Sequence, residues 1–338
     1  MLHDLASSLI LLSNYVFLPA LTYGSQLALG AVGVTLIFGI LRFANFAHGE
    51  LMAFGTMISI FLTWLFQSWG FRPGPLPTAL LTLPFAILAT AALALLTERS
   101  VFRFYRQRKS KPIILVIASV GVMFILNGLI RLFVGTDEIL FADGTKFLIK
   151  AGAFKKWTGL GEGLAIRQTQ VLTIVIAILA VALLFWFLQK TRTGKAMRAF
   201  SDNEDLALLS GINPDSIIRV TWVIAAALAT LAGVLYGLDK SFRPLVYFNL
   251  LLPVFASAIV GGVGQPVGAI VGGYIVAFSE VMATYAYRKF LKYFLPEEWM
   301  PSGLVQLLST EYKFAVSFII LVVVLLVRPT GIFKGKTL

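Results

Sequence analysis

The chain has 338 residues, of which 58% are apolar and 13% are charged, whereas an ordinary soluble protein carries about 25% charged residues. The apolar residues come in blocks of about 20, the length that crosses a hydrocarbon layer roughly 30 Å thick, so the composition excludes a soluble globular protein and indicates lipid as the solvent. The net charge of +12 does not indicate nucleic-acid binding, because Lys and Arg lie in short segments between apolar blocks, as on the cytoplasmic side of membrane proteins.

Apolar runs bounded by charge, Pro or Gly predict spans, in chain order, at residues 18–41, 51–69, 76–96, 113–134, 169–188, 217–238, 250–285 as a broken pair of half-length pieces, and 314–327. These runs predict an all-α, polytopic transmembrane helix bundle of about eight spans, or up to ten depending on how the termini and breaks are counted. We expect residues 1–338 to form a single transmembrane domain. Residues 1–17 are expected to form an interfacial helix or an extra crossing, without the features of a cleaved signal peptide.

The distribution of basic residues predicts the orientation of the spans. Segments 98–111 and 190–198 are dense in Lys and Arg, and we expect both in the cytoplasm. Segment 135–168 mixes fewer basic residues with four acidic ones, which is typical of a loop on the outer side.

Small residues recur at four-residue spacing in two predicted spans. They are Ala225, Ala229, Gly233 and Gly237 in one span, and Gly264, Gly268 and Gly272 in the other. This spacing places them on one helix face, where small side chains let helices approach closely in lipid. We interpret both stripes as packing surfaces.

The residues that catalysis requires are scarce. The only histidines are His3 and His48, cysteine is absent, and no zinc-ligand spacing or phosphate-binding glycine motif occurs. We therefore expect no catalytic residues, no metal site, no cofactor and no ATP site on this chain, and we do not expect it to be an enzyme by itself.

A polar turn between the first two predicted spans is the first candidate site. Asn45, His48 and Glu50 lie within it, and an ionisable residue at membrane depth is costly and therefore a functional candidate. We predict that these three residues line or gate a substrate path, with a purely structural turn as an equally weighted alternative. Glu280, in a later apolar run, is expected to be an interfacial carboxylate facing water.

The break in residues 250–285 is the second candidate. Gly261, Gly262 and Gly264 interrupt the apolar run before Pro266. A broken helix exposes backbone groups that only protein or a watery cavity can satisfy, and such breaks often line substrate paths. We predict that these glycines contribute to the path.

The segment from 190 to 215 carries the most specific local pattern. Ser201 and Glu204 have the spacing of a capping box, leucines follow, and Gly211 is a helix stop. Asn213 and Pro214 then have the residue types of a new N-cap and first turn. The pattern predicts a short cytoplasmic helix that begins at Ser201 and presents leucines to a partner.

Together with three further blocks, this loop resembles the LivH-type permease of branched-chain amino-acid importers. The blocks are Phe46–Glu50, Gly261–Gly264 followed by Pro266–Ala269, and an ending that runs from Ser309–Lys313 to Arg328–Gly331. The likeness extends from about Tyr23 to Gly331. About 20 residues between Tyr285 and Leu308 exceed the pattern, so docking of a binding protein there is expected to differ.

The resemblance implies a set of partners and a location. It implies a second homologous permease subunit, two cytoplasmic ATPase subunits that hydrolyse ATP, an extracytoplasmic substrate-binding protein and a lipid bilayer. It also implies a multi-pass protein of the bacterial inner membrane and assigns coupling to the ATPase to the loop residues Ser201, Glu204, Leu206, Leu208, Leu209 and Gly211.

The resemblance favours branched-chain or related small amino acids as substrates, and similar permeases carry urea or short amides. A secondary transporter driven by an ion gradient is the alternative from another class. Coupling to an ion gradient would require carboxylates near the bilayer midplane, for which Glu50 and Glu280 are the plausible residues.

Overall fold

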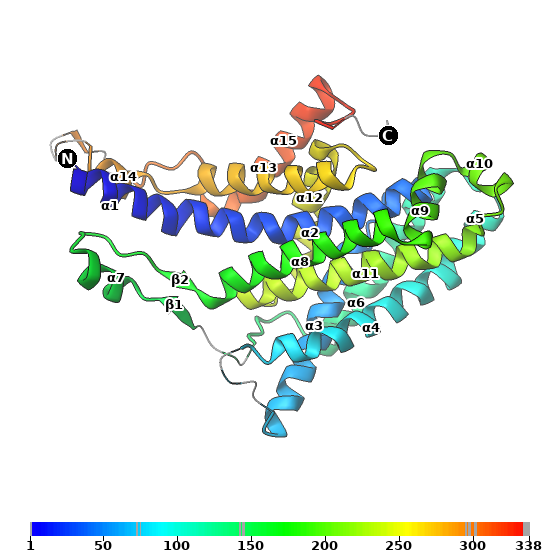
Figure 1. Ribbon diagram of the computed structural model, residues 1–338, viewed down its shortest axis with the longest axis horizontal. Helices are drawn as coiled ribbons and strands as arrows, with labels where there is room; N and C mark the ends of the chain where they lie inside the picture. The colour runs from blue at the N-terminus through cyan, green and yellow to red at the C-terminus, as the bar shows by residue number, and fades with distance from the viewer. Residues whose placement is uncertain are drawn as a thin grey trace.

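The computed structural model describes residues 2–71, 74, 76–141, 143, 146–294, 296, 299–300 and 303–333. Most of the described residues are helical (Figure 1). Its helices and strands are α1 (Leu2–Leu12), α2 (Leu18–Leu41), α3 (His48–Ser68), α4 (Ala79–Thr97), α5 (Arg103–Gln107), α6 (Pro112–Val134), β1 (Phe147–Ile149), α7 (Ala151–Thr158), β2 (Ile166–Arg167), α8 (Gln168–Lys190), α9 (Arg192–Asp202), α10 (Glu204–Leu209), α11 (Pro214–Asp239), α12 (Pro244–Gly261), α13 (Pro266–Thr284), α14 (Arg288–Leu291) and α15 (Lys313–Val327).

Within these described ranges, nine helices are long and apolar enough to cross a membrane. This number lies within the eight to ten spans expected from the sequence, and the predicted all-α polytopic bundle is confirmed. Segment 135–168, expected as an outer loop, contains regular structure. Strands β1 and β2 pair antiparallel, and α7 lies between them in the chain.

The first helix is longer than predicted. A π-helical turn (Ser13–Phe17) joins α1 to α2, so that one helical span runs without a break from His3 to Leu41. Its 39 residues measure roughly 58 Å at 1.5 Å per residue, about twice the hydrocarbon thickness. Residues 2–17 are therefore an extension of the first span. Asn14 attaches this extension to the hairpin region, donating to Gly163 O at 2.8 Å and accepting from Ala165 N at 2.9 Å.

The break expected within 250–285 is confirmed between α12 and α13, but the expected half length of the two pieces is wrong. Helix α12 has 18 residues and α13 has 19, so each is long enough to cross by itself and neither is half-length. The reason is that α12 starts at Pro244, before the apolar run that defined the prediction, with the proline in the first turn where its missing N–H is harmless.

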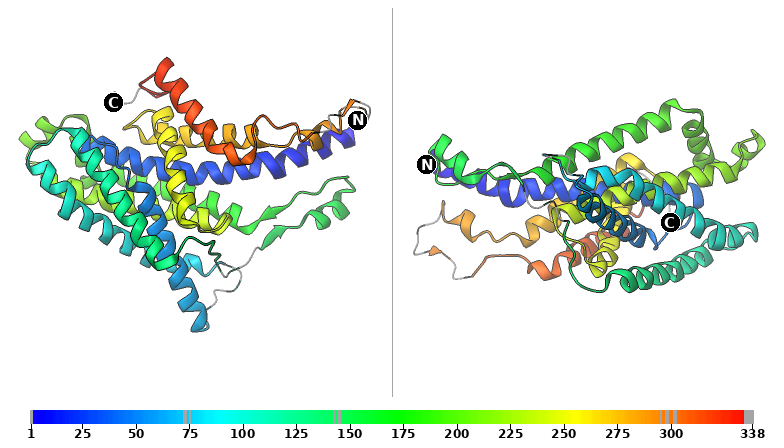
Figure 2. Two further views of the ribbon diagram at one scale, coloured as in Figure 1. Left: turned by 180° about the vertical axis from the view of Figure 1, so that it is seen from behind. Right: turned by 90° about the horizontal axis from the view of Figure 1, so that it is seen from below.

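Helix α2 forms the centre of the bundle. Residues 22 to 40 are all buried, and α2 packs against α13, α11, α12 and α8. Two views in Figure 2 show α6 and α15 toward the outside, and α9 and α10 at the opposite end from the β1–β2 hairpin and α14.

The predicted small-residue stripes pack closely, as expected. A Cβ added to Gly233 of α11 would lie 2.4 Å from Met52 O of α3. A Cβ added to Gly272 of α13 would lie 2.1 Å from Ser257 O of α12. Only residues without a side chain allow these backbones to approach so closely.

Candidate functional site

The polar turn between α2 and α3 lies inside the bundle. Helix α2 ends at Leu41, and its C-cap residue Arg42 has a φ of 57° that redirects the chain. The Asn45 side chain then accepts from Ala47 N at 3.1 Å. Asn45, His48 and Glu50 are 1%, 0% and 0% exposed. A simple water-facing turn would leave these side chains accessible, so the turn is part of the protein interior.

Glu50 reaches helix α6. Its Oε1 accepts from Asn127 Nδ2 at 2.9 Å, whereas Glu50 Oε2 and Asn45 Nδ2 have no hydrogen-bond partner among the described residues. A buried polar atom normally has a partner because burial without one costs about 1–3 kcal/mol. Both atoms therefore keep hydrogen-bonding capacity that the described residues do not use.

His48 occupies a space that a glycine provides. A Cβ added to Gly33 of α2 would lie 2.7 Å from His48 Cε1. The imidazole is therefore fixed directly against the central helix, at the start of α3. A displacement of α2 would therefore also displace the imidazole ring.

Sequence reasoning missed the contribution of α6. Besides Asn127, Ser119 of this helix accepts from Phe46 N at 3.1 Å and donates to Val116 O at 2.7 Å. Ser119 and Asn127 are eight residues apart and therefore share a helix face. Two polar residues on one face of an otherwise apolar run are the pattern from which Ser119 and Asn127 could have been predicted as site residues.

The three glycines of the second candidate form a tight turn between α12 and α13. Gly262 and Gly264 have φ of 109° and 85°, values that favour glycine. A Cβ added to Gly261 would lie 2.0 Å from Gly268 O, and one added to Gly331 would lie 2.5 Å from Gly262 N. Packing against α13 and the C-terminal segment accounts for these glycines locally.

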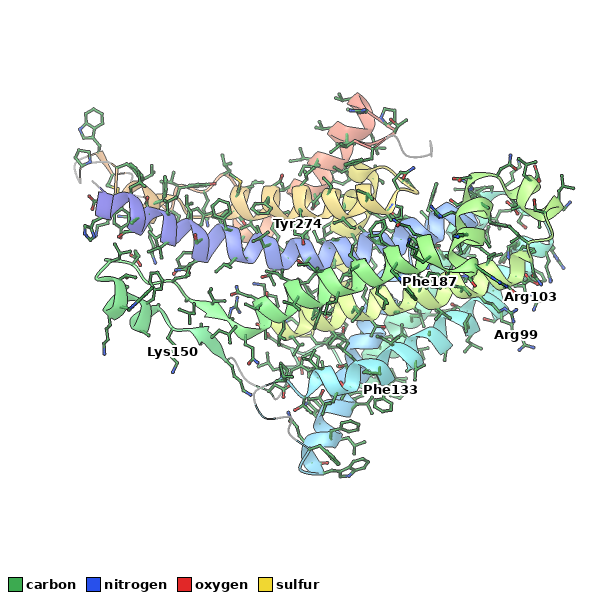
Figure 3. The ribbon with its side chains drawn as sticks, in the orientation of Figure 1. Arg99, Arg103, Phe133, Lys150, Phe187 and Tyr274 are labelled. Carbon is green, nitrogen blue, oxygen red and sulfur yellow. The ribbon has the colours of Figure 1, made fainter. Side chains whose placement is uncertain are left out.

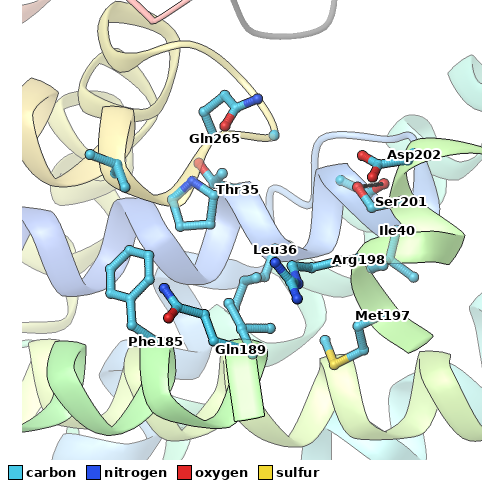
Figure 4. A pocket seen from close by; sticks show the side chains of 15 residues that line it. Thr35, Leu36, Ile40, Phe185, Gln189, Met197, Arg198, Ser201, Asp202 and Gln265 are labelled. Atoms are coloured by element: carbon cyan, nitrogen blue, oxygen red, sulfur yellow. Dashed lines mark hydrogen bonds between the residues drawn. The ribbon is translucent and has the colours of Figure 1, made fainter. Parts of the chain in front are cut away.

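Gly264 also lines a cavity of about 240 Å³, which is drawn in Figure 4. The cavity lies between α2, α8, α9 and the α12–α13 turn. Gly264 and Ser201, for which a coupling role was expected, line this same cavity, whereas the Glu50 carboxylate accepts a hydrogen bond from α6. The structure thus brings Gly264 to α9, whereas Glu50 and Asn127 do not line this cavity.

The coupling segment contains a short helix, but the predicted capping box is wrong. Ser201 lies within α9, and its hydroxyl donates to Gly39 O at 3.1 Å. Helix α10 begins at Glu204, and its cap is Asn203, which accepts from Leu206 N at 3.0 Å. The physical reason is that Gly39 belongs to the last turn of α2, where carbonyl groups lack partners within the helix and attract a donor.

The other local features of this segment are as predicted. Leu206, Leu208 and Leu209 are 61%, 42% and 85% exposed. Gly211 ends the turn with a φ of 79°, and Asn213 caps α11 by accepting from Asp215 N at 3.0 Å.

Two sets of contacts attach the coupling segment to the bundle. Arg42 Nη2 donates to Ser201 O at 2.5 Å, which joins α9 to the end of α2. At the start of α11, Arg106 donates to Asp215 Oδ1 at 3.0 Å and to Glu98 Oε1 at 2.6 Å. Trp222 Nε1 donates to the other oxygen of Glu98 at 2.9 Å, so this buried carboxylate is fully engaged.

Glu280 does not face water as expected. It is 1% exposed, and its Oε1 accepts a short hydrogen bond from the Ser317 hydroxyl of α15. The correction follows from a contact between residues 37 positions apart, which no local pattern could show.

Known proteins resemble the chain over most of its length. The family model described as the permease component of the branched-chain amino acid transport system matches residues 16–325. The high-affinity branched-chain amino acid transport system permease proteins LivH of Escherichia coli (strain K12) and BraD of Pseudomonas aeruginosa are 32% and 30% identical to it, each match covering 92% of both chains. The probable branched-chain amino acid transport permease protein LivH of Methanocaldococcus jannaschii is 29% identical, with 93% of this chain and 90% of that protein covered. The chain therefore belongs to the family of branched-chain amino acid transport permeases and is a membrane-spanning permease subunit of an ATP-binding-cassette importer.

Proposed function

We propose that this permease translocates branched-chain or related small amino acids across the bacterial inner membrane. In this proposal a soluble protein delivers the substrate from outside, a second homologous permease completes the pore, and two cytoplasmic ATPase subunits hydrolyse ATP. The similarity to relatives named for branched-chain amino acid transport, over nine-tenths of the chain, supports the substrate.

The observation that carries the ATPase coupling is the exposed leucine surface of α10. Leu209 is 85% exposed at the end of a helix that is itself fixed to the bundle. Large exposed side chains on a rigid element lying outside the apolar spans indicate a docking surface, because contacts that become desolvated carry most interface energy. We assign the docking role to segment 190–215.

Motion of α10 has two routes into the bundle. Ser201 and Arg42 connect α9 to the end of α2, and Arg106 and Asp215 connect the start of α11 to α5. Because α2 is the central helix and holds the His48 ring, movement of the first connection would change the polar turn.

The path itself is assigned to the polar turn and the glycine turn. Asn45, His48 and Glu50 supply polar atoms, and Gly261, Gly262 and Gly264 lie at the bend next to the cavity between α2, α8 and α9. Asn127 joins this set because it orients the Glu50 carboxylate. An amino acid carries an ammonium group, and a carboxylate with one unpartnered oxygen is a suitable partner for it.

Replacing Leu208 and Leu209 by Asp tests the docking surface. We expect normal membrane abundance, since the leucines are exposed already, and loss of both ATPase retention in pull-downs and amino-acid uptake. Leu307→Asp is the matched control for ATPase retention, because Leu307 is 79% exposed and its neighbour Leu308 bonds to Ala283 near the end of α13, away from α10. Full ATPase retention in the double variant would refute the docking assignment.

The substrate is tested with the complete importer in proteoliposomes containing ATP. Leucine uptake that valine and isoleucine inhibit, and that urea and acetamide leave unchanged, is the expected result. A protonophore should have no effect on this ATP-driven uptake. Competition by urea, or uptake that collapses with the protonophore, would favour the amide importer or the ion-coupled transporter instead.

A further inference from the structure

A pocket of about 360 Å³ with an arginine wall lies at the end of the bundle that carries α9 and α10. It is lined by residues of α4, α5, the segment between them and the start of α11, including Arg99, Arg103, Arg106 and Arg219. Arg99 and Arg103 are labelled in Figure 3 at this end of the molecule. Glu98 and Asp215 also line the pocket, so the wall carries an excess of two positive charges.

The positive charges are unequally neutralised. Arg106 binds both carboxylates, and Arg103 lies 3.7 Å from Asp215. In the described part of the chain no carboxylate pairs with Arg99 or Arg219, and Arg219 contacts only Asp215 O and the Ser216 hydroxyl, at 3.2 and 3.4 Å. Two guanidinium groups at the mouth of a pocket are suited to a phosphate, which they bind in a bidentate way.

A second hollow extends along the same helix. It has a volume of about 460 Å³, lies between α8 and α11, and is lined by apolar side chains only: Ala180, Leu183, Leu184, Trp186, Phe187, Val220, Val223, Ile224, Ala227, Leu228 and Leu231. Arg219 of the pocket and Val223 and Ala227 of this groove are four residues apart in turn, so they follow one face of α11.

A charged pocket and an apolar groove that adjoin along the stripe of Arg219, Val223 and Ala227 on α11 fit a single amphipathic ligand. We propose that an anionic phospholipid binds here, with its phosphate between Arg99 and Arg219 and one acyl chain in the groove between α8 and α11. The surroundings agree with this ligand, because the groove lies in a segment that spans lipid, and basic pockets next to transmembrane helices are suited to anionic headgroups.

The test uses the permease purified in its native complex, stripped of lipid by detergent and titrated with phosphatidylglycerol. We expect phosphatidylglycerol to raise the melting temperature of the wild type. Phosphatidylcholine and inorganic phosphate should require at least ten-fold higher concentrations. The choline cation of phosphatidylcholine cancels the negative charge of its headgroup and is repelled by the arginines, and inorganic phosphate has no acyl chain for the groove. Mass spectrometry of the lipids that remain after gentle purification gives an independent readout.

Three variants separate the two halves of the site. Arg99→Gln with Arg219→Gln should weaken phosphatidylglycerol binding at least ten-fold. Ala227→Phe should fill the groove and weaken it similarly while any binding of inorganic phosphate is unchanged. Arg192→Gln with Lys195→Gln is the control, since it removes the same charge from exposed positions of α9 and should leave lipid binding intact.

Several results would overturn the proposal. Equal binding of phosphatidylglycerol and inorganic phosphate by the wild type would identify a site for a soluble anion. An equal loss in the Arg192 and Lys195 control would indicate diffuse attraction. Loss of ATPase retention in the arginine variant with unchanged lipid binding would assign the wall to a protein partner. If a variant fails to fold, the comparison of the three ligands on the wild type still decides.

Discussion

Helix α8 is the more hydrophobic of two spans that pack side by side, yet it is far less buried than α2. The span containing α2 has a stretch with a mean hydropathy of 1.8 that is 94% buried, whereas the corresponding values for α8 are 3.0 and 22%. Hydropathy in this protein therefore reports contact with lipid. Helices inside the bundle contain small residues, which allow close packing, and polar residues, which find partners there.

The largest expected effect comes from placing the same side chain inside and outside. Gly233→Leu should destabilise the bundle by about 3 kcal/mol or more, because a Cβ would already lie 2.4 Å from Met52 O. Gly121→Leu on α6 should change stability little, since a Cβ there meets nothing within 4 Å. The melting temperature and monodispersity of the purified complex measure both. Equal losses would break the distinction between inner and outer helices.

A second pair of variants compares a buried with an exposed carboxylate. Glu50→Gln should lower uptake at least ten-fold at equal abundance, because the amide preserves the volume and can still accept from Asn127 while the charge is lost. Glu138→Gln should leave uptake unchanged. Glu138 is an exposed partner of Arg243, and hydrogen bonds from Ser241 and Arg243 lower its pKa below the usual range. Unchanged uptake in the Glu50 variant would identify the turn as structural.

The spans could be predicted from sequence because each one depends on a local run of apolar residues. The same holds for Gly211, Asn213 and Pro214, whose effects on helix ends are decided within a few positions. Apolar runs and helix-end residues are local in sequence, so they predict where most helices lie without knowledge of the tertiary structure.

What could not be predicted depends on contacts between distant positions. Glu50 meets Asn127 across 77 positions, and Ser201 meets Gly39 across 162. The spacing of Ser201 and Glu204 predicts a capping box from local sequence alone. In the structure the Ser201 hydroxyl instead donates to the Gly39 carbonyl at the end of α2, and Asn203 caps α10. Composition cannot indicate which distant groups will compete for one donor.

The smallest expected effect tests this connection between the coupling segment and the inner helix. Ser201→Ala removes the hydrogen bond to Gly39 O and should cost about 1 kcal/mol at that contact. Helix α10 keeps its Asn203 cap, so docking should persist. We expect the ATP hydrolysed per amino acid transported to rise about five-fold, the factor that corresponds to about 1 kcal/mol, with full ATPase retention in the pull-down.

Asn203→Ala is the opposite variant, because it weakens α10 by about 1 kcal/mol and leaves the Ser201 bond in place. It should lower ATPase retention, while each importer that remains assembled keeps the wild-type ratio of ATP to substrate. The two substitutions are two positions apart and similar in cost, so general destabilisation would affect both measurements equally in both variants. Opposite patterns are expected only if α10 binds the ATPase and Ser201 transmits its motion to α2. The same pattern in both would show that segment 190–215 acts as one unit and that its bond to α2 has no separate role.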